Sequence, residues 1–213
     1  MRHRIATKSE GAMATLLLTA TQDVSDSLAQ KLEKVGYDSI ILPLLEITDV
    51  KWEAPFSPPK NILITSRYGL KTANLFKGCP LYIVGHKTAE LAREQGHTIA
   101  HIGFTIDSLF RHLPEDILYL RGRDVSQELP LPSIICYEAT PTDYLNTIPP
   151  YDAAILLSAR AAKHLPDIQN PIICLSQQVK DALSQHNQAL ATTAAEPTEY
   201  ELIEAIKHWN TDS

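Results

Sequence analysis

The sequence predicts an α/β protein made of two similar lobes, each built on a parallel sheet. Short apolar runs typical of buried strands alternate with segments of helical periodicity along most of the 213 residues. A strand–helix–strand–helix stretch from Asn61 to Gly96 has a fainter copy that begins at Ile155. Two extended runs separate the middle of the chain from its ends, which indicates that the middle forms a lobe of its own.

Composition and charge are those of an ordinary globular protein and exclude several classes of function. The net charge of −6 and the isoelectric point near 5.7 argue against a nucleic-acid partner, which would need a basic face. No apolar run approaches the roughly 20 residues of a membrane span, so we expect no membrane partner. Cys79, Cys136 and Cys174 lack C-x-x-C spacing, which favours buried thiols in a reducing, cytoplasmic compartment.

The chain opens with a segment that we exclude from the fold. Residues 1–13 lack periodicity and end at a second methionine, so we interpret them as a disordered extension or leader. Thr15–Thr19 is an apolar run that predicts a buried strand. A helix follows, with apolar residues at helical spacing up to Gly36, which is typical of a helix C-terminus.

Two segments without helical periodicity come next. Residues 39–47 form an extended run, and Pro43 within it removes one backbone donor. Because proline is excluded from central strands, this run predicts a strand that leaves its sheet. Residues 52–60 contain Pro55, Pro58 and Pro59 and predict a connector.

The middle of the chain alternates strands and helices. The predicted strands cover residues 61–65, 81–84, 98–102 and 117–122. The predicted helices cover residues 68–78, 88–95 and 106–110. This alternation implies right-handed βαβ units and a parallel sheet. After Arg123 the pattern changes, because residues 124–131 offer barely two helical turns.

A strand at residues 133–138 and a connector rich in proline and threonine lead into a second series. The series contains strands at residues 153–157, 171–175 and 189–192, and helices at residues 160–165, 179–185 and 198–209. It aligns with the middle of the chain when Ser66 is set against Ser158. Gly96 then falls on Asn187, and both residue types tolerate the left-handed backbone region.

Any series of βα units looks self-similar, but the positions of the connectors favour a real duplication. We therefore predict one lobe that is inserted into another. The inserted lobe covers residues 48–132, and the discontinuous lobe covers residues 14–42 and 138–213. Linker strands at residues 40–47 and 133–139 join the two.

Several common sites are absent from the sequence. It contains no G-x-x-x-x-G-K-[ST] phosphate loop, no G-x-G-x-x-G dinucleotide motif and no G-x-S-x-G nucleophile elbow. His97 and His101 lie in a predicted strand, where their spacing is not that of the helical zinc-binding pair. We therefore expect no metal site.

Hydroxyl side chains and helix N-termini gather instead at the predicted carboxyl ends of strands. Ligands of open parallel sheets bind outside those ends, where free amides and the helix dipole favour carboxylates. The hydroxyls belong to Thr65, Ser66, Thr88, Ser158 and Ser176. The alternative is that they only cap their helices. Basic residues near the same ends favour a small polyanionic ligand; they are Arg67, Lys71, Lys87, Arg121, Arg123, Arg160 and Lys163.

Motifs spread over the chain from Leu16 onward point to one family by their order and spacing. They are Leu-Pro-Leu-Leu-Glu-Ile47, Ile-Thr-Ser-Arg-x-Gly69, Val-Gly-x-x-Thr-Ala89, Leu-x-Leu-Arg-Gly122, Cys-Tyr-Glu138 and Ala-Glu-Pro-Thr198. In these motifs the chain resembles the uroporphyrinogen-III synthases. The resemblance implies two flavodoxin-like parallel-sheet lobes, one of them discontinuous, joined by a two-stranded ladder.

The resemblance implies cyclisation of hydroxymethylbilane, a linear tetrapyrrole, to uroporphyrinogen III with loss of water and inversion of the terminal ring. The reaction passes through an azafulvene cation and a spiro intermediate. Without enzyme the unrotated isomer forms, so the protein must hold one conformation of its substrate in the cleft between the lobes. The resemblance further implies that no cofactor or metal is needed. Nothing in the sequence demands more than a monomer, and the preceding pathway enzyme is the candidate protein partner.

The resemblance also implies roles for individual residues. Tyr137 corresponds to the tyrosine that assists departure of the hydroxyl, and packing of a strand is the alternative role. Thr88 corresponds to a binding threonine, and Ser66 and Ser158 correspond to strand-end contacts. The other substrate contacts expected by position are Thr19, Thr65, Arg67, Gly85, His86, Lys87, Ala159, Ser176, Gln177 and Gln178.

Three departures from the family pattern leave a second function open. Ala20-Thr21 replaces Arg-Pro, Ser176 and Val179 replace a glycine and a threonine, and residues 123–133 are short. The alternative is a non-catalytic relative that binds a tetrapyrrole or another polyanion as a sensor or partner module. Because the inserted lobe keeps more of the pattern, we expect the firmest substrate contacts there and a lid-like role for the other lobe.

Overall fold

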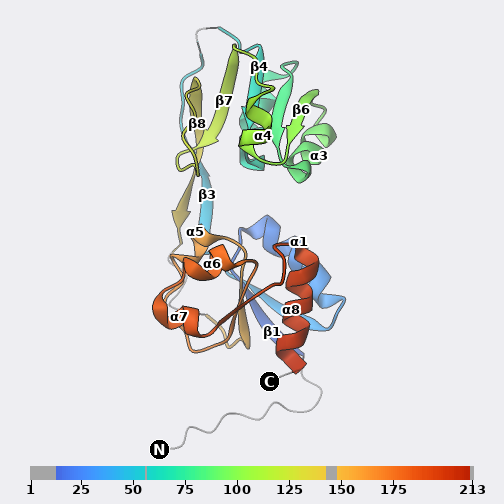
Figure 1. Cartoon of the computed structure of the whole chain (residues 1–213), viewed down its shortest axis with the longest axis vertical. Helices are drawn as coiled ribbons and strands as arrows, with labels where there is room; N and C mark the ends of the chain where they lie inside the picture. The colour runs from blue at the N-terminus through green and yellow to red at the C-terminus, as the bar shows by residue number, and fades with distance from the viewer. Residues whose placement is uncertain (1–12, 56, 143–147, 212–213) are drawn as a thin grey trace, which may run out of the picture. The chain divides into compact units, whose positions relative to one another are not determined.

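The computed structural model (Figure 1) describes residues 13–55, 57–142 and 148–211. The chain separates into two compact units. The inserted lobe covers residues 47–140, and the discontinuous lobe combines the chain up to residue 46 with the chain from residue 141. The chain changes unit within β3 (Leu45–Asp49) and near the end of β8 (Ser133–Pro141). Apart from Met13, the predicted leader lies outside the described residues.

The discontinuous lobe is built on a five-stranded parallel sheet with the order β11-β10-β9-β1-β2. Its strands are β1 (Ala14–Leu18), β2 (Tyr37–Ile41), β9 (Ala153–Leu156), β10 (Ile172–Cys174) and β11 (Ala191–Thr193). Its helices are α1 (Gln22–Glu33), α5 (Ala159–Ala162), α6 (Gln177–Asp181), α7 (Gln185–Ala189) and α8 (Glu199–Thr211). Counted along the chain, the strand order is 2-1-3-4-5, which is the flavodoxin-like order.

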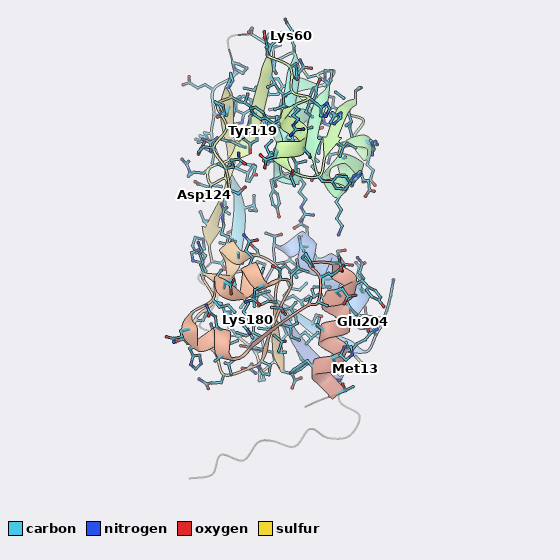
Figure 2. All side chains as sticks on the ribbon, viewed as in Figure 1. Met13, Lys60, Tyr119, Asp124, Lys180 and Glu204 are labelled. Carbon is cyan, nitrogen blue, oxygen red and sulfur yellow. The ribbon has the colours of Figure 1, made fainter. Side chains whose placement is uncertain are left out.

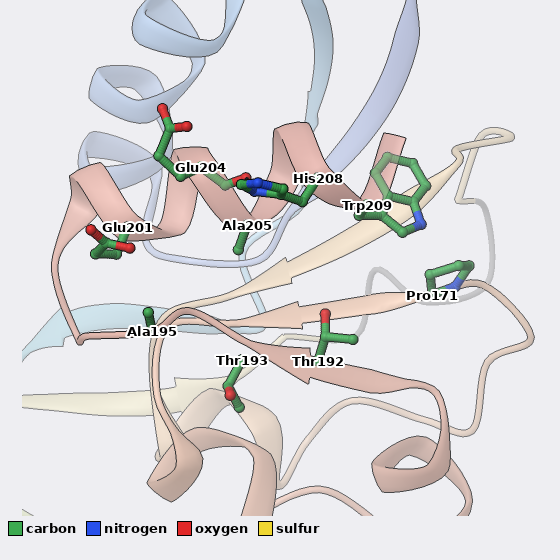
Figure 3. A pocket seen from close by; sticks show the side chains of 9 residues that line it. All are labelled: Pro171, Thr192, Thr193, Ala195, Glu201, Glu204, Ala205, His208 and Trp209. Carbon is green, nitrogen blue, oxygen red and sulfur yellow. The ribbon is translucent and has the colours of Figure 1, made fainter. Parts of the chain in front are cut away.

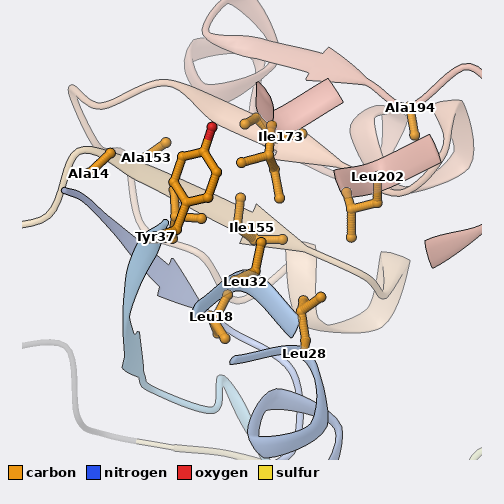
Figure 4. Packing of buried hydrophobic residues seen from close by; sticks show 12 residues of the cluster. Ala14, Leu18, Leu28, Leu32, Tyr37, Ala153, Ile155, Ile173, Ala194 and Leu202 are labelled. Atoms are coloured by element: carbon orange, nitrogen blue, oxygen red, sulfur yellow. The ribbon is translucent and has the colours of Figure 1, made fainter. Parts of the chain in front are cut away.

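One face of this sheet carries a hydrophobic cluster of the discontinuous lobe (Figure 4). Leu28 and Leu32 of α1 are buried there together with Ile155 of β9. Leu202 of α8 joins the same cluster. The apolar positions that recur at helical spacing are therefore the buried faces of α1 and α8, which confirms both predicted helices.

The inserted lobe is built on a six-stranded sheet with the order β3-β8-β7-β4-β5-β6. Its other strands are β4 (Asn61–Ile64), β5 (Leu81–Val84), β6 (Ile99–Gly103) and β7 (Ile117–Gly122). Its helical segments are η1 (Arg67–Gly69), α2 (Leu70–Ala73), η2 (Asn74–Phe76), α3 (His86–Glu94) and α4 (Ile106–Phe110). The pairings from β6 to β8 are parallel. The predicted fold class of two parallel-sheet α/β lobes is confirmed.

The two sheets have the same spatial arrangement when the chain is followed from different starting strands. β4, β5, β6, β7 and β8 occupy the places that β9, β10, β11, β1 and β2 occupy in the other lobe. The lobes are therefore circular permutations of one βα arrangement, and this relation supports the predicted repeat. Ser66 and Ser158 follow the equivalent strands β4 and β9. In each lobe the strand order reverses beside that strand, between β4 and β7 or between β9 and β1.

The extended run predicted at residues 39–47 is two strands. β2 belongs to the sheet of the discontinuous lobe and β3 to the sheet of the inserted lobe, with Pro43 between them. The Leu42 amide donates to the Leu18 carbonyl at 2.9 Å, and the Leu44 amide donates to the Thr19 carbonyl at 3.1 Å. These bonds hold the chain beside the end of β1 on both sides of the proline.

Two further predictions about helices are wrong. Residues 124–131 contain no helix. The helix predicted at residues 179–185 is instead the end of α6 and the start of α7, because Ser184 begins a new helix by accepting from the Asn187 amide at 3.2 Å. Asn187 is helical rather than left-handed, and its buried side chain accepts from the Ile168 amide at 3.1 Å.

The three cysteines are free, with Cys136 and Cys174 buried and Cys79 half-buried. Burial raises the pKa of the Cys174 thiol to about 12, so this thiol stays protonated at neutral pH. These thiols therefore behave mainly as small hydrophobic groups. Among the described residues, no helix is long and apolar enough to cross a membrane.

Candidate functional site

The carboxyl ends of the strands in the inserted lobe gather most of the predicted site residues. Thr65 and Ser66 follow β4, Gly85 follows β5, and Gly122 ends β7. The strand order of this sheet reverses between β4 and β7. Because ligands of open α/β sheets bind in the crevice at such a reversal, we call this set of strand ends the switch edge.

Tyr137 lies on β8 beside the switch edge and is half-buried. The β7–β8 pairing shifts register after Arg121, and this shift places Gly122 opposite Tyr137. The Arg123 amide donates to the Tyr137 carbonyl at 2.9 Å and fixes the backbone there. The ring of Tyr137 lies 5.6 Å from the ring of Tyr68, measured between centroids, with the planes tilted by 56°.

The environment of Tyr137 keeps its phenol protonated. Burial raises the pKa of Tyr137 above its usual value of 10.0, while hydrogen bonding with Ser66 and with the Gly122 backbone acts in the opposite direction. At neutral pH this side chain is therefore a hydrogen-bond donor with two neighbours that stabilise its charged form. Such a group has the properties of a weak general acid.

A second tyrosine, Tyr119 of β7, lies at the same edge (Figure 2). Its hydroxyl is 2.7 Å from the Thr65 Oγ1, and burial raises its pKa. Both tyrosines line a hollow of about 400 Å³ that opens at the switch edge. Its polar lining comes from Thr65, Ser66, Thr105, Tyr119, Asp124, Ser126, Gln127 and Tyr137.

Ser66 and Ser158 stand at equivalent strand ends but use their hydroxyls differently. The side chains of Ser158 and Ser176 accept from backbone amides three residues later, both at 3.4 Å, and so cap their helices. Ser66 makes no side-chain cap. It precedes the 3₁₀ segment η1, in which the Gly69 amide donates to the Ser66 carbonyl at 3.0 Å. The capping alternative therefore holds for Ser158 and Ser176 but not for Ser66.

The start of α3 provides a further part of the switch edge. Gly85 has a φ of 90°, and its amide donates to the Gly103 carbonyl at 2.9 Å. The next three amides belong to the first turn, which leaves them without intrahelical partners and favours an anionic group. His86 and Lys87 are exposed and Thr88 is half-buried. The His86 ring lies 5.0 Å from that of Phe104.

The expected contacts of the discontinuous lobe are engaged within that lobe. Thr19 is 1% exposed, and its hydroxyl donates to the Ile155 carbonyl at 2.8 Å, which ties β1 to β9. The Gln177 side chain donates to Asp181 at 2.7 Å. Gln178 is exposed, and Ala159 begins α5 after Ser158. Thr19 and Gln177 therefore have polar groups that are already engaged, whereas Thr65, Ser66 and Tyr137 of the inserted lobe line a hollow.

Several predicted cations of the inserted lobe are paired with carboxylates of the same lobe. Arg121 lies 3.2 Å from Glu128, and Arg123 lies 2.5 Å from Glu138. Lys71 is paired with Asp49. The attraction of a polyanion to these side chains is therefore weaker than the sequence suggested, because each cation already has a counter-ion.

The histidines singled out in the sequence do not meet. His97 is buried in the turn before β6, and its Nε2 lies 2.9 Å from the Asn74 Oδ1. His101 stacks on His112 at 4.0 Å. Across the described residues, no three histidine, cysteine, aspartate or glutamate side chains are grouped as a metal site would need.

A larger hollow of about 620 Å³ lies on the discontinuous lobe between α8 and β11 (Figure 3). Glu201, Glu204, His208 and Trp209 line it from α8. Pro171, which precedes β10, lines it from the amino end of that strand. The two carboxylates among its lining residues, Glu201 and Glu204, make this hollow less suited to an anionic ligand than the switch edge.

Three residues of the switch edge were not identified as site residues from the sequence. Tyr119 and Tyr68 looked like strand and helix core residues, and Gly122 was noticed only as the last residue of a motif. A glycine inside a strand often marks a close approach of another group, and this signal was available for Gly122.

Together, the fold and the switch edge define a two-lobed α/β protein with doubly wound sheets. A family model described as uroporphyrinogen-III synthase HemD matches residues 26–204. The chain therefore belongs to the uroporphyrinogen-III synthase family, and its role is the cyclisation step of tetrapyrrole biosynthesis. No curated protein sequence matches the chain.

Solved structures of the family have the same fold at low sequence identity. The chain is similar to uroporphyrinogen-III synthetase from Helicobacter pylori, with 15% identity and a TM-score of 0.71. That similarity covers 92% of this chain and 100% of the other. A mutant uroporphyrinogen III synthase from Thermus thermophilus is 12% identical, with a TM-score of 0.52 and coverage of 94% and 100%.

Proposed function

We propose that this protein cyclises hydroxymethylbilane at the switch edge, with Tyr137 as the donor that assists departure of the hydroxyl. The observation that carries the proposal is the setting of Tyr137. Its phenol borders the hollow of about 400 Å³ beside Ser66, and burial keeps it protonated. The discontinuous lobe supplies fewer polar side chains in our proposal, since Ser158 and Ser176 cap helices.

The proposed reaction begins at the hydroxymethyl group of the substrate. The C–O bond of the hydroxymethyl group breaks, its electron pair leaves with oxygen, and the proton of Tyr137 completes a water molecule. The resulting azafulvene cation is attacked by the substituted α-carbon of the terminal ring, which gives the spiro intermediate. This intermediate fragments and recloses at the unsubstituted α-carbon, and the proton released there restores the phenol. We expect no metal or cofactor to take part.

The second task in our proposal is control of substrate conformation. The uncatalysed reaction closes the unrotated ring, so the protein must favour the spiro route by holding the terminal ring in place. The substrate carries many carboxylates, and the first-turn amides of α3 with the hydroxyls of Thr65, Ser66 and Thr88 suit such groups. Arg67, His86 and Lys87 are further contacts that we propose from their positions.

We also propose that the protein acts as a cytoplasmic monomer. The three free cysteines support a reducing compartment. The preceding pathway enzyme is the partner that we propose, because its product closes without assistance and direct transfer would limit that loss. Size-exclusion chromatography with light scattering, with and without that enzyme, tests both statements. A stable homodimer would contradict the first, and no interaction at micromolar concentrations would contradict the second.

A second candidate function is non-catalytic binding of a tetrapyrrole as a sensor or partner module. The observation that favours it is the pair Ser176 and Val179, which stand where the inserted lobe has Gly85 and Thr88. Val179 is 4% exposed and Ser176 caps α6, so neither offers a polar group to a ligand.

One experiment separates the two functions. The purified protein is supplied with hydroxymethylbilane, and the products are oxidised and separated into isomers. We expect the rotated isomer to accumulate in proportion to enzyme. The unrotated isomer alone, formed at the enzyme-free rate, would contradict catalysis. Quenching of tryptophan fluorescence by uroporphyrinogen III in such a protein would then support the binding function.

A further inference from the structure

Gly122 lies at the end of β7 directly against the ring of Tyr137. A Cβ atom at this position would lie 2.7 Å from Cε2, 2.9 Å from Cζ and 3.2 Å from the hydroxyl of Tyr137. Carbon atoms pack best at about 3.5–4.0 Å, so a side chain at Gly122 and the ring in its present place exclude each other. The ring occupies the space that any other residue would fill.

Backbone conformation does not explain this glycine. Among the residues that the structure describes, the glycines with positive φ are Gly36, Gly78, Gly85 and Gly96, and Gly122 is not one of them. A Cβ at any of those four positions would meet no heavy atom within 4 Å. Gly122 therefore differs from these four glycines. Its φ would accept other residues, and the nearest atoms that a side chain would meet all belong to the Tyr137 phenol.

A second aromatic ring and the local backbone also constrain Tyr137. Tyr68 contributes a tilted ring at 5.6 Å. The register shift after Arg121 and the bond from the Arg123 amide to the Tyr137 carbonyl fix the backbone from which the ring projects. The phenol is thus held between the backbone of β7 and the ring of Tyr68, and Tyr137 lines the hollow of about 400 Å³.

We propose that Gly122 is a positioning residue, whose missing side chain creates the slot that holds the Tyr137 phenol at the reacting hydroxyl. This inference rests on the proposed function, in which Tyr137 assists departure of that hydroxyl. Proton donation requires the phenol within about 2.6–3.2 Å of the leaving oxygen. A side chain at Gly122 must displace the ring by at least roughly 0.8 Å to restore ordinary contact from 2.7 Å.

The kinetic test is a double-mutant cycle of Gly122→Ala and Tyr137→Phe. We expect Gly122→Ala to lower kcat roughly tenfold to hundredfold, as for a misplacement of about 1 Å, and to change KM less than threefold. In the Tyr137→Phe background, which already lacks the donor, Gly122→Ala should lower kcat less than twofold further. Equal losses in both backgrounds, or no loss in either, would overturn the inference.

A stability cycle keeps the inference testable if Gly122→Ala folds poorly. The collision needs the ring, so Gly122→Ala should lower Tm in the wild-type background and change it little in the Tyr137→Ala background. Equal lowering of Tm in both backgrounds would show that the ring is not the obstruction. Gly103→Ala is the matched control, because its Cβ would meet Leu109 at the same distance of 2.7 Å. It should lower Tm in both backgrounds.

A spectroscopic readout separates this inference from the proposed function. The ultraviolet difference titration between each protein and its Tyr137→Phe counterpart reports the ionisation of Tyr137 alone. A ring displaced from its slot should ionise closer to the ordinary value of about 10 in Gly122→Ala, and remain unchanged in Gly103→Ala. An unchanged titration in Gly122→Ala would overturn the slot. Full turnover by Tyr137→Phe would instead contradict the proposed function. The titration and the Tm cycle would still decide whether Gly122 forms a slot for the Tyr137 ring, because neither depends on turnover.

Discussion

The two lobes share one arrangement of strands, yet they treat the ends of those strands differently. Ser158 and Ser176 of the discontinuous lobe cap the helices that follow them. Ser66, at the place equivalent to Ser158, precedes a 3₁₀ segment and makes no side-chain cap. Ser66 lines the hollow of about 400 Å³ together with Tyr137. At Ser66 the backbone carbonyl accepts from the amide three residues later, so the hydroxyl does not serve as a cap and hydrogen-bonds Tyr137 instead.

A second difference concerns the connection beside the strand-order reversal. In the discontinuous lobe, α1 connects β1 to β2 and buries Leu28 and Leu32 on the sheet. In the inserted lobe, the equivalent connection from β7 to β8 has no helix. Val125 and Leu129 of this loop are only partly buried against the cluster that contains Tyr119. The same loop lines the hollow, so the shortened connection leaves room where the other lobe has a helix.

The largest expected effect tests whether helix and loop contribute differently to stability. Leu32→Ala, at a fully buried position of α1, should cost about 2–5 kcal/mol of unfolding free energy. Leu129→Ala, at a half-buried position of the loop, should cost about 1 kcal/mol. Urea unfolding of both variants measures the difference. Equal losses would show that the loop stabilises its lobe as much as α1 does, which would contradict the proposed difference between the two connections.

The next effect concerns catalysis by Tyr137 of the inserted lobe. Tyr137→Phe keeps the ring and removes the donor, so kcat should fall on the order of 100-fold while Tm changes little. For the wild type, the raised pKa of Tyr137 means that the contribution of this donor stays constant through neutral pH. It should be lost only as the pH rises past that pKa, above about 10.

The control for this variant is Tyr200→Phe, which removes the same atom from an exposed tyrosine of α8. It should leave kcat within a factor of about two. Initial rates of formation of the rotated isomer measure both variants. Equal kcat values for Tyr137→Phe and the wild type would remove Tyr137 from the mechanism and leave it with the packing role.

A smaller effect separates the two serines. Ser158→Ala removes a helix cap and should cost about 0.5–2 kcal/mol of unfolding free energy. Ser66→Ala removes no cap and should cost less than about 0.5 kcal/mol, while it lowers kcat/KM roughly tenfold through the lost contact with Tyr137. Unfolding curves and initial rates of both variants measure the contrast. A stability loss in Ser66→Ala as large as in Ser158→Ala would contradict it.

Much of the fold could be predicted because most strands are continuous apolar runs. The strands Leu81–Val84 and Ile117–Gly122 have the predicted bounds. The helix expected at residues 179–185 could not be divided correctly, because the break depends on Ser184 as a cap and on burial of Asn187 against a distant loop. Local periodicity carries no information about either contact.

The candidate site was predictable only in part. Tyr137 and Ser66 came from motifs, but the approach of Gly122 to Tyr137 depends on a register shift between two strands. Such a shift depends on how β7 pairs with β8 and cannot be read from the sequence of either strand alone. The different use of Ser66 and Ser158 has a similar origin, because the two have similar extended φ and ψ angles and only the next turn differs.

The smallest effect concerns the segments that precede the equivalent strands β6 and β11 in the two lobes. A buried side chain anchors each segment: His97 in the turn before β6 and Asn187 in α7 before β11. Only the histidine titrates, and burial, assisted by Lys77, lowers its pKa below 6.5. The unfolded chain therefore binds a proton more readily than the folded one. The stability that neutral His97 contributes is fully present above about pH 6.5 and is lost as the pH falls toward the lowered value.

The loss through one such group is limited to about 1.4 kcal/mol per pH unit. His97→Gln keeps a polar side chain without the titration, so its unfolding free energy should fall less than that of the wild type between pH 7 and pH 5. Urea unfolding across this range measures both slopes. Asn187→Gln is the matched control in the other lobe and should lower stability by the same amount at every pH. Parallel slopes of unfolding free energy against pH for wild type and His97→Gln would show that titration of His97 does not affect stability.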